Sequence, residues 1–164
     1  MTSREIIRRL EEAGRGTELE YVARIMKEGR QTLIEFPDCP GCQTFAKRGE
    51  NALAVGREAL EGWLEIHLED GDAPPRPAFR PTSRRGSFAA IRIDPALAIR
   101  LGIRWARQDA RLSQGELAER VGVSRQQISL LESQGGNVTV GTLVKIARAL
   151  GREVEVSLVT PSAA

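Results

Sequence analysis

The sequence predicts an α+β fold, in which a front part of order β-β-β-α-β precedes an all-α rear part that ends in a strand. Three observations support this prediction. Residues 19–36 alternate apolar with polar side chains, which is typical of half-buried strands. Residues 50–69 carry apolar side chains at helical spacing. Residues 112–132 have the pattern of two short helices joined by a tight turn.

The front part opens with a predicted amphipathic helix over residues 3–14, and from Leu19 the pattern changes to strands. Residues 27–30 turn the chain between the first two strands. Residues 36–44 contain two prolines, which cannot donate hydrogen bonds to a sheet. We therefore expect a rigid turn there, leading into a third strand that ends near Lys47.

A longer helix is predicted from about Glu50 to Glu69. Its expected buried stripe consists of Ala52, Val55, Ala59, Trp63 and Ile66, with Leu53, Leu60 and Leu64 beside it. Residues 74–86 contain four prolines and four arginines, a composition that favours a semi-rigid, extended connection. A fourth strand is expected over residues 87–93.

The motif at residues 112–132 is a helix-turn-helix. Ser113 and Ser124 each precede a Glu or Gln by three residues, the spacing of a capping box, so each can start a helix. Gly122 lies where the turn needs a residue without a Cβ. The side chains expected to point outward on the second helix are Ser124, Arg125, Gln126 and Ser129. Arg and Gln can make paired hydrogen bonds to guanine and adenine, so the motif predicts DNA binding rather than protein packing.

The rear part is expected to begin at Asp94, a good N-cap, with Pro95 at the first helical position. Its last element is a predicted strand over residues 152–159. The apolar face of this strand consists of Val154, Val156 and Leu158. A lone strand after a helical domain must pair with something. We therefore expect a homodimer, or a higher even oligomer, held together by this strand.

Residues 107–150 closely resemble the Xre/Cro-type helix-turn-helix family. The matching residues are Arg107, Leu112 to Gln114, Glu116 to Ala118, Gly122, Ile128, Leu131, Glu132, Leu143, Ile146, Ala147 and Ala149 to Gly151. The chain departs from the family at residues 133–136, where Ser-Gln-Gly-Gly replaces a shorter turn of Asn-Gly type.

This resemblance implies a role for several side chains. Gln114 corresponds to a residue that anchors on phosphate, and Arg125 and Gln126 correspond to residues that touch bases. Arg107 and Glu132 are expected to form a partly buried ion pair between the first helix and the end of the recognition helix.

The turn FPDCPGC at residues 36–42, the Ala-rich helix that follows, and the Gly71 to Pro77 segment resemble the HicB antitoxin family. The resemblance covers about residues 21–93. It implies that the front part is a partial, catalytically silent RNase H-like domain whose partner is the basic, mRNA-cleaving toxin HicA. Residues 3–14 also resemble the opening helix of HicA-type toxins, but the toxin's catalytic histidine stretch does not follow.

The 164 residues have room for two small domains. We expect an N-terminal helix (1–18), a toxin-neutralising domain (19–93) and a DNA-binding and dimerisation domain (94–164). The resemblances together imply an antitoxin that blocks HicA and represses its own operon. One alternative is a ligand-responsive helix-turn-helix repressor without a toxin, and another is a residual RNase H-like nuclease.

Charge is distributed unevenly along the chain. Residues 1–74 carry a net charge of −5, residues 75–94 carry +4 and residues 95–164 carry +3, within a total of +2. A basic rear part suits DNA, whereas an acidic front part suits a basic partner.

Other chemistry is not expected. Cys39 and Cys42 form a C-x-x-C, but His67 is the only histidine, so one chain cannot complete a zinc site from Cys and His. Glu35 and Asp38 flank the second strand without the further carboxylates that RNase H-type catalysis needs. We therefore expect no enzyme activity, metal or cofactor. The charged N-terminus, the two cysteines and the lack of a long apolar run predict a cytoplasmic protein without membrane contact.

Overall fold

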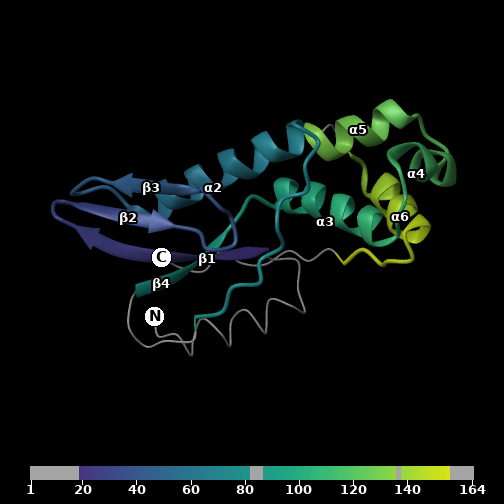
Figure 1. Ribbon diagram of the computed structural model, residues 1–164. Helices are drawn as coiled ribbons and strands as arrows, with labels where there is room; N and C mark the ends of the chain where they lie inside the picture. The colour runs from purple at the N-terminus through teal and green to yellow at the C-terminus, as the bar shows by residue number, and fades with distance from the viewer. Residues whose placement is uncertain (1–18, 82–86, 136–137, 156–164) are drawn as a thin grey trace.

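The computed structural model describes residues 19–81, 87–135 and 138–155 (Figure 1). The front part contains β1 (Glu20–Glu28), β2 (Gln31–Glu35), β3 (Gln43–Ala46), α2 (Ala52–Glu69) and β4 (Ser87–Arg92). The rear part contains α3 (Pro95–Asp109), α4 (Gln114–Val121), α5 (Arg125–Ser133) and α6 (Val140–Ala149). The predicted α+β class and the predicted order of these elements are confirmed.

The four strands form one antiparallel sheet of order β3-β2-β1-β4. Gly29, with φ +61°, closes the hairpin between β1 and β2, because this left-handed conformation suits a residue without a Cβ. The chain then crosses one face of the sheet as α2 and returns as β4 beside β1 (Figure 1). The sheet is therefore complete only after α2 has packed on it.

Helix α2 buries the predicted stripe only in part, with Ala52, Val55 and Trp63 half-buried against the core. Its buried residues are Gly56, Leu60, Leu64 and Leu68. Ile66, which was placed in the stripe, is 59% exposed, and that expectation was wrong. The reason is Gly56, where an added Cβ would lie 3.0 Å from Cγ2 of Ile34. Because Gly56 lets the helix approach the sheet closely, the row of leucines that follows it one turn apart faces the core.

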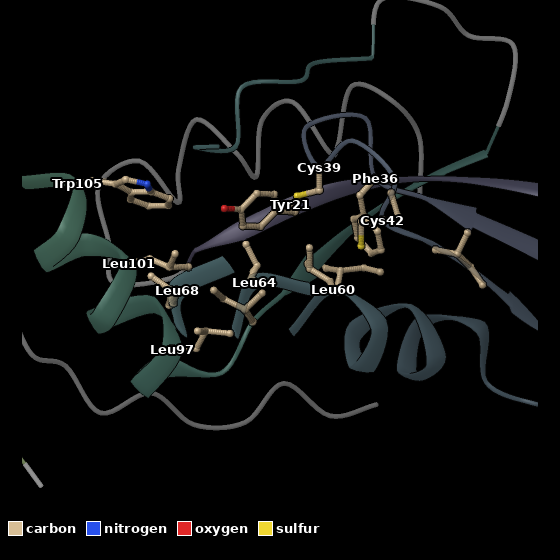
Figure 2. Close-up of a cluster of buried hydrophobic side chains, with 14 of the residues drawn as sticks. Tyr21, Phe36, Cys39, Cys42, Leu60, Leu64, Leu68, Leu97, Leu101 and Trp105 are labelled. Atoms are coloured by element: carbon tan, nitrogen blue, oxygen red, sulfur yellow. The ribbon is translucent and has the colours of Figure 1, made fainter. Parts of the chain in front are cut away.

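The front core extends into helix α3. Leu97, Leu101 and Trp105 of α3 belong to the same buried cluster as Leu64 and Leu68 of α2 (Figure 2). Another side of α3 contributes Ile103 to a second apolar cluster, formed with α4, α5 and α6. One helix therefore belongs to two cores, and it joins the front part to the rear part directly.

The Pro/Arg-rich connection is fastened to the front core over its described residues. The carbonyl of Pro74 accepts a hydrogen bond from Nε1 of Trp105 at 2.8 Å. The carbonyl of Pro75 accepts one from the hydroxyl of Tyr21 at 2.7 Å. The carboxylate of Asp38 accepts further bonds from two backbone N–H groups of the connection. These contacts keep this extended segment against the domain.

Two predicted elements lie wholly or partly outside the described residues. The helix over residues 3–14 is one. The other is the strand over residues 152–159, of which residues 152–155 have no regular secondary structure in the single chain, while Val156 and Leu158 are outside the description. Val154 is partly exposed. No helix in the described ranges is both long enough and apolar enough to span a bilayer.

Candidate DNA-binding site

Helix α4 begins at a capping box. The hydroxyl of Ser113 accepts a hydrogen bond from the backbone N–H of Glu116 at 3.1 Å, and the carboxylate of Glu116 accepts one from the backbone N–H of Ser113 at 2.7 Å. The bond that the carboxylate accepts from the backbone N–H of Ser113 lowers the pKa of Glu116. The predicted box is confirmed, and it sets the first residue of the helix.

The turn and the start of α5 also follow the prediction. Gly122 closes the turn with φ +77°. The hydroxyl of Ser124 accepts a hydrogen bond from the backbone N–H of Gln127 at 3.1 Å, and the side chain of Gln127 accepts one from the backbone N–H of Ser124 at 2.8 Å. This second capping box makes Arg125 the first residue of α5.

Apolar packing determines which side of α5 faces solvent. The second core consists of Ile103, Leu117, Ala118, Ile128, Leu131 and Ile146. Because Ile128 and Leu131 pack one side of α5 into this cluster, the first turn and the opposite side of α5 remain open to solvent.

The predicted DNA contacts lie at this open end. Ser124, Arg125 and Gln126 are exposed, and Ser129 is half-buried one turn further along. Among the described residues, neither Arg125 nor Gln126 has a side-chain hydrogen-bond partner, so both side chains are available to a ligand. An Arg followed by a Gln at the start of a helix can present paired donors and acceptors to base edges in a major groove.

A buried ion pair anchors the other end of α5. Arg107 donates from Nε and Nη2 to the two oxygens of Glu132, at 2.6 and 2.8 Å, and from Nη1 to the carbonyl of Leu112 at 2.8 Å. The hydrogen bond to Glu132 raises the pKa of Arg107. Nε2 of Gln114 also donates to Glu132, at 3.1 Å. The amide that the family resemblance assigned to phosphate is therefore half-buried and partly used inside the motif.

Two other residues near this site, Arg100 and Arg104, were not predicted from the sequence to have a role. Arg100 and Arg104 of α3 are buried, although charged residues rarely are unless they are paired. Their spacing offered a signal, because Arg100, Arg104 and Arg107 fall on one side of a helix whose other positions are mostly apolar.

The two cysteines of the front part are buried and form no disulfide. Burial raises the pKa of Cys39 to about 12 and that of Cys42 to about 11. A thiol of this kind is protonated at neutral pH and is a poor nucleophile or metal ligand. We therefore interpret the pair as part of the apolar core.

The other chemistry-bearing groups of the front part have local partners. Glu35 pairs with Arg24 at 3.1 Å, and the ring of His67 stacks on Trp63 with centroids 3.7 Å apart. Within the described ranges, no three His, Cys, Asp or Glu side chains gather in a way that could hold a metal ion.

Comparison with known proteins identifies the rear part. A helix-turn-helix family model matches residues 103–156. A stretch of 51 residues, 31% of the chain, is 51% identical to an uncharacterised HTH-type transcriptional regulator of Methanothermobacter thermautotrophicus and covers 74% of it. The chain belongs to the helix-turn-helix family.

Most of this helix-turn-helix chain is also homologous to HicB antitoxins. It is 28% identical over 128 residues to Antitoxin HicB 1 of Photorhabdus laumondii, which is 77% of each chain. It is 24% identical over 127 residues to Antitoxin HicB of Escherichia coli K12, which is 77% of this chain and 89% of the relative. The resemblances to HicB and to the helix-turn-helix family are thus confirmed, and neither is an enzyme family.

Proposed function

We propose that this chain is an antitoxin that binds and blocks a HicA-type mRNA-cleaving toxin and represses its own operon by binding operator DNA. One observation carries the proposal. In a chain homologous to HicB antitoxins, an exposed Arg125–Gln126 pair begins a helix whose other end is anchored by the buried Arg107–Glu132 ion pair. The end of this helix that carries Glu132 is held in place, and the end that carries Arg125 is accessible to DNA bases.

The DNA half of the proposal follows from the exposed end of α5. Arg125 would make paired hydrogen bonds to a guanine and Gln126 to an adenine in the major groove. The hydroxyls of Ser124 and Ser129 and the remaining amide hydrogen of Gln114 would donate to the sugar-phosphate backbone of the DNA. Hydrogen-bond donors near the start of a helix are well placed to bind phosphate oxygens.

A second copy of the chain would complete the DNA-binding unit. We propose that residues 152–159 pair with their copy in a two-fold dimer, with Val154, Val156 and Leu158 on the buried face. Two-fold symmetry would then place two α5 helices about 34 Å apart, one turn of DNA. An operator with two inverted half-sites is the expected ligand.

The toxin half of the proposal rests on homology and charge. Residues 1–74 carry −5, and electrostatic attraction speeds the binding of a basic partner and selects for it. The antitoxin would act by covering the toxin, so it needs no catalytic group or cofactor of its own. Residues 19–93 are the proposed toxin-binding part.

The decisive variant replaces Arg125 and Gln126 with Ala. Both side chains are exposed and lack partners among the described residues, so the fold is expected to stay intact. Loss of a bidentate Arg–guanine contact costs about 1–3 kcal/mol, roughly 5- to 150-fold in operator affinity per half-site. Toxin affinity is expected to stay unchanged.

The measurement is a pair of titrations, one against DNA upstream of the gene and one against the partner toxin. A matched control is Gln108→Ala with Arg111→Ala, which removes the same residue types from exposed positions at and just after the end of α3. Full operator affinity in the Arg125/Gln126 variant would contradict the assignment of α5. Loss of toxin binding as well would contradict the division of labour between the two parts.

A further inference from the structure

Helix α3 carries three buried arginines, Arg100, Arg104 and Arg107, along one side. Their side chains are only 10%, 6% and 10% exposed. Desolvation lowers the pKa of Arg104, which shows the cost of this location. Because a buried charge is tolerated only when it is well paired, the partners of each arginine indicate its role.

Arg107 and Arg104 have different partners. The hydrogen bonds of Arg107 stay within the rear part, as described above. Arg104 donates to the carbonyl of Leu68, in the last turn of α2, at 3.1 Å, and to that of Gly71, just past the end of α2. Its Nε lies 3.8 Å from the carboxylate of Glu132 on α5. Because the last carbonyls of a helix carry partial negative charge, one guanidinium joins the ends of two helices.

Arg100 joins the same two helices one turn earlier on α3. Nη1 lies 3.4 Å from Oε1 of Glu65 on α2, and Nη2 donates to the carbonyl of Ser133, the last residue of α5. Two arginines therefore make the same connection, from the end of α2 to the end of α5.

The loop after α5 is shaped to fit Arg100. Gly135 has φ +65°, and a Cβ there would lie 2.9 Å from Cδ of Arg100. This is the segment where the sequence departs from the shorter turn of the helix-turn-helix family. The departure thus allows the backbone to pass closely over an arginine that reaches the front part.

The arrangement also orients α5. Its C-terminal end lies next to the C-terminal end of α2, and its first turn points away from the front part (Figure 1). Contacts at one end of the helix therefore set the direction of the end that carries Arg125.

From these contacts we propose that Arg100 and Arg104 are positioning residues that clamp the recognition helix to the front part, so that DNA bound at α5 stabilises the front core. The statement about DNA rests on the proposed function, whereas the clamp itself does not. Because linkage is reciprocal, a partner bound by the front part changes operator affinity through the same contacts.

The tryptophans of the chain allow a direct test. The only two, Trp63 and Trp105, pack in or against the front core, so their fluorescence reports its unfolding. Circular dichroism at 222 nm reports all of the described helices, and α4, α5 and α6 among them belong to the rear core alone, so this signal also follows the unfolding of the rear part. In the full-length wild type, thermal unfolding by the two probes is expected to share one midpoint.

The clamp variant is Arg100→Met with Arg104→Met, which keeps an unbranched apolar stem and a good helix former. Its fluorescence and dichroism midpoints are expected to separate. The control is Arg57→Met on the exposed side of α2, which should leave the midpoints together. Where the double variant fails to fold, Arg104→Lys keeps the charge but loses the planar fork that reaches two carbonyls.

DNA then tests the functional link. A fragment from upstream of the gene, at about 100 times its Kd, should raise the fluorescence midpoint of the wild type by roughly 5 °C or more. In the clamp variant it should raise only the dichroism midpoint. Separate midpoints in the wild type, or unchanged behaviour in the variant, would overturn the proposal. If no upstream DNA binds the wild type, the proposed function fails, while the midpoints without DNA still decide the clamp.

Discussion

Replacing Arg107 with Ala is expected to destabilise the rear part by about 3–5 kcal/mol, because it leaves a buried carboxylate without its main counter-charge. The side chain of Glu132 is 0% exposed, and Arg107 donates to both of its oxygens. After the substitution, the partners of this carboxylate that remain among the described residues would be Gln114 at 3.1 Å and Arg104 at 3.8 Å. An exposed pair contributes at most about 1 kcal/mol, so burial determines the magnitude.

Urea unfolding followed by circular dichroism measures this loss. With a slope of about 2 kcal/mol/M, a loss of about 3 kcal/mol lowers the midpoint by roughly 1.5 M. Arg111→Ala is the control, because Arg111 lies only four residues later, just past the end of α3, and is exposed. Equal midpoints for the two variants would refute the reasoning. A further variant, Arg107→Met with Glu132→Leu, removes both charges and should recover most of the lost stability, because apolar replacement of a whole buried pair is close to neutral.

Two other outcomes are expected. Truncation after Leu150 should abolish dimers of the chain and weaken operator binding; a truncated chain that still sediments as a dimer would locate the interface elsewhere. Cys39 and Cys42 should resist iodoacetamide at pH 8 until the chain is unfolded, because burial raises their pKa from 9.0 to about 12 and 11. Because the folded state keeps both thiols protonated, their contribution to stability should be complete below pH 9 and be lost as the pH rises through the folded pKa values of about 11 and 12. Rapid labelling of the folded protein at pH 8 would contradict their placement in the core.

The packing of α2 shows how a periodic pattern can give the right element and the wrong face. Apolar side chains surround much of this helix, so spacing alone allowed more than one buried stripe. Gly56 determines which face of α2 packs on the sheet, because its missing Cβ allows the helix to come into contact with Ile34. A glycine adds little to a count of apolar residues, so the pattern placed Ile66 inside although it is exposed.

The sequence by itself determined the elements and the helix-turn-helix. Two capping boxes, at Ser113 and Ser124, and the left-handed turn at Gly122 each involve residues within a few positions of one another. All participants in these interactions can therefore be identified from the sequence. Only the tertiary structure decided how the two parts are joined. Arg104 meets its partners at and just past the end of α2, 36 and 33 residues earlier in the chain, and whether those carbonyls face it depends on how α2 and α3 share one core. Such contacts follow from packing across the chain, and no local pattern can encode them.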